Sequence, residues 1–181
     1  SDAYSDSLKL SYNIGGMFKD FVCGWNKIIL PFDKADEKNN MNFETICAIR
    51  LNCTAFGIGR DNNIAVAGLT FTTTDYTEKT VEGKITDVTF GLTDAGEGLN
   101  VSEITVGDNT FDGVYVNGWG GYVRVLTLDE TYDVLALKNS GRGALAFRFY
   151  FKDEADLNYY KSVTTFNFDV CSSDTYSDDH K

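Results

Sequence analysis

The sequence is almost without histidine and proline. The one histidine, His180, stands near the C-terminal end, and Pro31 is the one proline among 181 residues. Without a histidine in its interior, the chain cannot build a Ser-His-Asp triad, a Cys-His pair or a histidine-rich zinc site. The motifs GxSxG, HExxH, the P-loop and a GxGxxG after a strand are also missing. Two facing carboxylates would still make a glycosidase, but spacing marks out none of the 27 Asp and Glu residues.

The sequence also lacks a long apolar run and an excess of basic charge. No stretch of 18 apolar residues is present, so no membrane span is predicted, and no basic-then-apolar signal segment stands at the start. Sixteen basic residues against 27 acidic ones give a net charge of −11. That charge would repel a nucleic-acid backbone and an anionic lipid surface alike. We therefore expect neither nucleic acid as a partner nor membrane insertion.

The dominant pattern is alternation of apolar and polar residues, which is typical of strands with one buried face. The alternating segments are residues 8–14, 84–92, 122–128, 147–152 and 163–170, and the more continuously apolar ones are 28–32, 46–51 and 64–71. Turns rich in Gly, Asn and Asp separate them. We predict an all-β fold of about ten strands in an antiparallel two-sheet sandwich, Ig-like or jelly-roll, with a barrel as the alternative. Short helices are expected over 17–23 and 153–160, and a polar loop over 32–42.

The strand pattern predicts a single β-sandwich domain over residues 8–171. A polar N-terminal tail, residues 1–7, would precede it, and an acidic tail or linker, residues 172–181, would follow. The start reads like that of a mature or excised fragment. The tails contain the similar segments SDAYSD and SDTYSD. This echo fits one unit of a longer array with a repeated linker, or coincidence in tails rich in Ser and Asp.

The four cysteines form an even set, which suits two disulfides with three possible pairings. They are Cys23, Cys47, Cys53 and Cys171. Cys47 and Cys53 are six residues apart, so within one strand they would share a face about 20 Å apart and could not bridge each other. We favour the pairs Cys23–Cys53 and Cys47–Cys171, and with them an extracellular location. Four buried thiols are the alternative.

Glycines surround a tryptophan in the segment 118–122, which reads GWGGY. A ring left uncrowded in this way can stack on the apolar face of a sugar, and Tyr115 and Tyr132 would extend such a platform. Trp25 would supply a second one. The alternative is that the tryptophan caps the core while the glycines make a tight turn. The predicted ligand-binding residues are Trp119, Tyr122, Tyr115 and Trp25.

A possible calcium site starts at Asp108, where the sequence reads DNTFDG. Asp108 and Asp112 occupy the first and fifth positions, with glycine at the sixth, as in the first half of an EF-hand loop. Trp119 stands where the bidentate glutamate belongs, so the segment is not an EF-hand. Calcium is the one cofactor with a candidate site; the alternative is that acidic loops keep the protein soluble.

A set of segments follows a recognisable order: residues 10–23, with a strand, a glycine and a first cysteine; 27–30; 46–53, an alternating strand that ends in a cysteine; and 145–151 and 163–170. Together they resemble the Ig-like subunits of chaperone–usher fimbriae. The resemblance implies a Cys23–Cys53 bridge and assembly by donation of an N-terminal strand. The polar N-terminus, the acidic C-terminus and the extra cysteines, Cys47 and Cys171, depart from the family's pattern.

Taken together, these features predict an extracellular, non-enzymatic β-sandwich module that is structural or adhesive. It would work at a cell surface or in a filament, with protein subunits of the same or a related kind as partners. Edge strands or loops would form the interfaces. The alternative is a carbohydrate-binding module that stacks a glycan on exposed aromatic rings.

Overall fold

The computed structural model describes residues 8–53, 64–75, 79–83, 85–90, 101–106, 109–115 and 123–172. Its strands are β1 (Lys9–Asn13), β2 (Gly24–Pro31), β3 (Glu37–Asn39), β4 (Ile46–Asn52), β5 (Ile64–Thr73), β6 (Lys79–Gly83), β7 (Ile85–Phe90), β8 (Val101–Val106), β9 (Asn109–Tyr115), β10 (Val123–Tyr132), β11 (Gly143–Phe151) and β12 (Asn167–Cys171). The helices are the 3-10 helices η1 (Gly15–Asp20) and η2 (Phe32–Lys34) and the α-helices α1 (Leu135–Asn139) and α2 (Glu154–Lys161). Neither described α-helix is long and apolar enough to cross a membrane.

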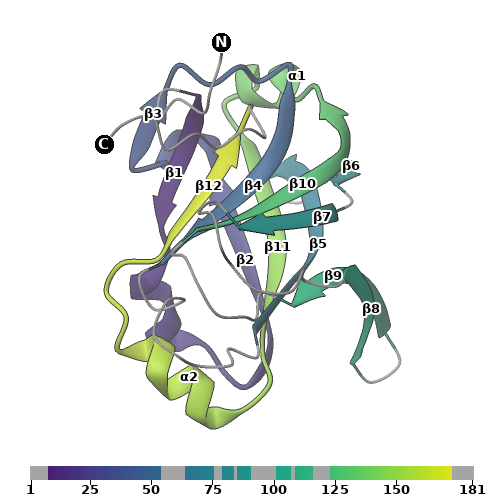
Figure 1. The fold of residues 1–181 in the computed structure, drawn as a ribbon. Coiled ribbons are helices and arrows are strands. Elements are labelled where there is room, and N and C mark those ends of the chain that lie inside the picture. Colours follow the sequence, from purple (N-terminus) through teal and green to yellow (C-terminus); the bar gives the residue numbers. More distant parts are fainter. Residues whose placement is uncertain are drawn as a thin grey trace.

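The strands form two antiparallel sheets (Figure 1). Sheet A has the order β3-β1-β12-β4-β10-β7. Sheet B has the order β2-β11-β5-β9-β8, and β6 also pairs with β5. The prediction of an all-β chain, mostly strands in antiparallel sheets with few helices, is confirmed.

The two sheets share one aromatic core. Phe147 of β11 stacks on Phe168 of β12 with ring centroids 4.2 Å apart, and Phe71 of β5 lies 5.4 Å from Tyr132 of β10. Alternate side chains of a strand point to opposite faces, so the alternation around Phe147 places every second residue of β11 in this core. Full burial of each such ring stabilises the fold by roughly 1.5–3 kcal/mol.

A second set of rings closes the end of the core beside α2. Phe18 of η1 lies at its centre, with ring centroids 5.2 to 5.8 Å from those of four neighbours. These neighbours are Phe149, Phe151, Tyr160 and Phe166. They come from β11, from α2 and from the approach to β12, so the rings tie three separate segments to η1.

The helices follow the sequence in part. Asp153 caps α2, since its carboxylate accepts a hydrogen bond of 2.9 Å from the backbone N–H of Asp156, and the predicted helix over 153–160 is confirmed. The segment expected to be helical over 17–23 instead forms η1, which ends before Phe21 because the backbone there is extended. α1 was not predicted, and at five residues it is too short to show a helical period.

The segment 32–42 is not a simple polar loop, as the sequence suggested. It contains η2 and the short strand β3, which pairs with β1 at the edge of sheet A. The predicted tails, residues 1–7 and 173–181, lie outside the described residues.

Candidate functional site: an aromatic face on sheet B

One row of paired residues crosses sheet B on the face opposite the core. The positions in order across the sheet are Trp25, Tyr150, Ala65 and Tyr115. Directly paired residues of neighbouring strands share a face. In β11 that face is set by Phe149 and Phe151, which point into the core and leave Tyr150 between them to point outward.

Trp25 and Tyr150 form a pair of adjacent rings within this row. Their ring centroids are 5.0 Å apart with the planes tilted by 46°, and both side chains are half-buried. Asn26 fixes the strand next to Trp25: its Nδ2 donates to the carbonyl oxygen of Val22 at 2.8 Å, and its Oδ1 accepts from the N–H of Val22 at 2.9 Å. The pair is therefore held on a rigid strand end rather than on a loop.

The next outward-facing row adds positive charge beside the rings. Lys27 of β2 pairs directly with Arg148 of β11, and the row continues through Ala67 to Gly113. Lys27 is exposed and Arg148 is half-buried. Ala65 and Ala67 are fully buried, so the accessible part of these rows lies on β2 and β11. There the outer face of sheet B carries two rings and two cations next to each other in a chain with a net charge of −11.

Sequence reasoning identified this face incompletely. The sheet places Trp25 and Tyr115 in one row, although the sequence separated them by 90 positions. Trp119 and Tyr122 lie outside the described residues. Tyr132 was wrongly predicted to extend the platform, because it is 3% exposed in the core and its hydroxyl is hydrogen-bonded to Asp129. Tyr150 was missed, although its alternation with core phenylalanines indicated an outward position.

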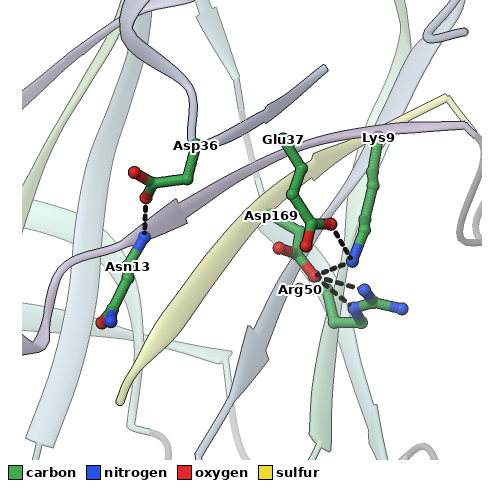
Figure 2. A network of polar contacts seen from close by, with 6 residues as sticks. All are labelled: Lys9, Asn13, Asp36, Glu37, Arg50 and Asp169. Atoms are coloured by element: carbon green, nitrogen blue, oxygen red, sulfur yellow. Dashed lines mark hydrogen bonds and ion pairs between the residues drawn. The ribbon is translucent and has the colours of Figure 1, made fainter. Parts of the chain in front are cut away.

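The opposite side of the molecule carries a buried charge network (Figure 2). On the face of sheet A opposite the core, Arg50 Nε donates to Asp169 Oδ2 at 2.7 Å, and a second Arg50 nitrogen contacts the same oxygen. Lys9 Nζ lies 3.9 Å from that oxygen and 3.6 Å from Glu37 Oε2. Because Arg50 and Asp169 are both buried, this network holds strands together and offers no open site.

The alternation of core-facing and outward-facing residues shifts within β4, and this shift puts two of the cysteines on opposite faces of the strand. Ile46 and Ile49 both lie in the core although they are three residues apart, and the register of β4 with β10 shifts at this point. Cys47 consequently packs against the cluster of Ala48 and Cys171 on the outer face, whereas Cys53 joins the core. The expectation that Cys47 and Cys53 share a face is therefore wrong, because a bulge inverts the alternation.

The structure has no disulfide among the four cysteines, so the two bridges stay predictions. Cys171 is buried, and burial together with the charge of Asp169 raises the pKa of its thiol to about 12. Cys23 is half-buried before β2, and desolvation together with the carboxylates of Glu154 and Asp153 raises its pKa.

The predicted calcium site stays a prediction. Asp108 lies outside the described residues, and Asp112 is placed only by its backbone in β9. Among described residues, no cluster of three or more His, Cys, Asp or Glu is arranged to hold a metal.

Comparison with known proteins identified no relative. A scan against protein-family models and searches of curated proteins and of solved structures found no match to this chain. The resemblance to fimbrial subunits therefore stays a prediction based on the sequence segments given above. Function is inferred below from the residues of this chain alone.

Proposed function

We propose that this chain is an extracellular, non-enzymatic β-sandwich module that binds carbohydrate on the outer face of sheet B. The observation that carries the proposal is the contact between Trp25 and Tyr150, with Tyr115 in the same row. A pyranose ring presents a flat C–H face, and half-exposed aromatic rings on a sheet are the surface that such a face stacks on. The rings also belong to strands, which hold a binding surface more firmly than loops do.

The sandwich architecture and the location are part of the same proposal. Contacts between the facing sheets, such as Phe147 on Phe168, support a sandwich of the Ig-like or jelly-roll kind. The packing of Cys47 against the cluster of Ala48 and Cys171 supports one of the two predicted disulfides, and disulfides persist outside the cell. The intact mass with and without reductant, followed by peptide mapping, tests this: two disulfides lower the mass by about 4 Da. Four thiols in protein purified from an oxidising compartment would contradict it.

The binding site is tested with Trp25→Ala and Tyr150→Ala. The wild-type chain is screened on an array of plant, microbial and animal glycans, and the affinity for the best one is measured by titration calorimetry. We expect each variant to lose at least about tenfold in affinity, since a buried aromatic anchor contributes at least about 1.4 kcal/mol.

Tyr159→Ala is the matched control, because Tyr159 is also a half-buried tyrosine but belongs to α2 and not to the strands of sheet B. Thermal unfolding of all three variants separates loss of binding from loss of folding. Unchanged affinity in both face variants, or an equal loss in the control, would refute the site. The absence of any glycan ligand would refute the function.

Assembly through an edge strand is the second candidate, and the strand order favours one edge for it. β2 is an end strand of sheet B in the described order and is eight residues long. β3, at the end of sheet A, has only three residues, two of them charged, which discourages pairing with a neighbour. A structural or adhesive filament would therefore grow on β2. Electron microscopy and sedimentation at high concentration test this, and a strictly monomeric chain would exclude it.

A further inference from the structure

A pocket is lined by residues of β1, of the segment 32–43 and of the segment from α1 to the start of β11. In Figure 1, β3 and α1 lie at the end of the core opposite α2. The volume of the pocket is about 410 Å³, within the range of roughly 300–1,000 Å³ typical of small-molecule sites. The walls are apolar, with Leu10, Phe32, Met41 and Phe43. The rings of Phe32 and Phe43 lie 5.5 Å apart between their centroids. This pocket is separate from the aromatic face of sheet B.

Two lysines border the pocket. Lys38 Nζ donates to the backbone oxygen of Asp33, and Lys138 Nζ lies 5.8 Å above the ring of Phe43. Both are exposed, so their stems line apolar surface while their ammonium groups meet solvent. Among the described lining residues Asp33 is the one acid, and its carboxylate already pairs with Lys34 at 3.2 Å. The mouth of the pocket is therefore cationic, in a chain with a net charge of −11.

The strand that brings Lys38 to the pocket is fixed from both sides. Leu10 and Lys38 are directly paired between β1 and β3, so they share the pocket side. On the other side, Glu37 contacts Lys9, and Asp36 Oδ2 accepts from the N–H of Asn13 at 2.6 Å (Figure 2). These contacts hold β3 in place before any ligand arrives, which lowers the entropic cost of binding.

The opposite wall is equally fixed. A Cβ added at Gly143 would stand 2.7 Å from Phe32 Cδ2 and 2.7 Å from the backbone oxygen of Leu137. The ring of Phe32 therefore packs directly on the backbone at the start of β11, where only glycine leaves room for it. A preformed apolar floor with cations at its mouth is the arrangement that suits a ligand with one apolar and one anionic end.

We infer that this pocket binds a small organic monocarboxylate with an apolar body. The body would lie on Phe32, Met41 and Phe43, and the carboxylate would face the ammonium groups of Lys38 and Lys138. A neutral ligand would gain only the apolar contacts, and a cation would be repelled by both lysines. Affinity for the anion should fall as salt is added, because the lysines are exposed and their attraction is screened.

The experiment uses the full chain, with octanoate as the probe and 1-octanol as its neutral counterpart of equal chain length. Heteronuclear NMR titration reports both affinity and location. We expect octanoate to shift the amides of residues 38–43 and 138–143 and to bind about tenfold tighter than octanol, as charge-assisted contacts allow. Lys38→Gln and Lys138→Gln should each remove most of that difference.

Lys161→Gln is the matched control, because it removes an exposed lysine of α2 that is not part of the lining and pairs with none of the described lining residues. It should change octanoate affinity by less than about twofold, in keeping with a screened surface charge. Octanoate that binds no tighter than octanol, or an equal loss in all three lysine variants, would overturn the inference. Because Trp25 and Tyr150 are not in this pocket, glycan binding can fail or succeed independently of the result.

Discussion

The outer faces of the two sheets start from the same alternating pattern and end in opposite environments. On sheet A, Lys9, Arg50 and Asp169 occupy the alternate positions and are at most 7% exposed. On sheet B, Trp25 and Tyr150 occupy such positions and are half-buried. Charged side chains are thus buried on sheet A, whereas the aromatic pair on sheet B stays partly exposed. Whether an outward-facing side chain of a strand is exposed to water is therefore not decided by its own polarity. It is decided by the strands and side chains that surround it.

The largest effect should come from breaking the buried network. Arg50→Ala leaves the carboxylate of Asp169 buried with only Lys9, at 3.9 Å, beside it. Loss of one partner of a buried ion pair costs about 3–5 kcal/mol of unfolding free energy. Denaturant unfolding measures the change, and Arg142→Ala is the control, since the Arg142–Asp75 pair is half-exposed and worth about 0–1 kcal/mol. Equal costs for the two variants would contradict a special role for sheet A's outer face.

Replacing both partners sharpens the same comparison. The double variant Arg50→Met with Asp169→Leu leaves no unpaired charge between β4 and β12. Lys9 Nζ retains its ion pair with Glu37 Oε2 at 3.6 Å. Apolar pairs that replace a buried ion pair are often neutral or more stable by about 1–4 kcal/mol. We therefore expect the double variant to recover most of the stability lost in Arg50→Ala. A double variant as unstable as the single one would show that the cost arises from packing rather than from stranded charge.

The next effect concerns alkaline pH and again belongs to sheet A. Burial first, and then Asp169, raise the pKa of Cys171 from 9.0 to about 12. Burial disfavours the thiolate, so the stabilising contribution is complete below pH 9 and is lost as pH rises towards 12. Between these values the reduced protein should lose about 1.4 kcal/mol per pH unit through this group.

Cys171→Ala isolates that contribution. Tyr12, whose pKa burial also raises, titrates in both proteins and cancels in their comparison. Unfolding free energies of the reduced proteins are measured from pH 8 to 11. The variant should show the shallower decline, and parallel curves would mean that the thiol of Cys171 is not desolvated in solution.

Much of the fold follows from local pattern, whereas the sites do not. The alternation in 147–152 predicts β11, and the apolar run 28–32 predicts the end of β2. Their mutual register is set by contacts between residues more than 100 positions apart, so the contact of Tyr150 with Trp25 has no local signal. The pocket is still less visible, because its walls come from four separate segments. The short strand β3 and the bulge in β4 form because of tertiary packing, which overrides the local sequence pattern.

The smallest stability effect should come from Trp25→Ala on the outer face of sheet B. The ring is half-buried rather than enclosed in the core, so we expect a cost near the average of about 1 kcal/mol. Phe147→Ala, in the core between the sheets, should cost about 3–5 kcal/mol in the same assay. If Trp25→Ala approached the Phe147 value, Trp25 would be a packing residue, and the contrast between the two outer faces would lose its functional meaning. A small cost accompanied by lost glycan affinity is the result that assigns the exposed rings to binding, because it separates what Trp25 does for the ligand from what it does for the fold.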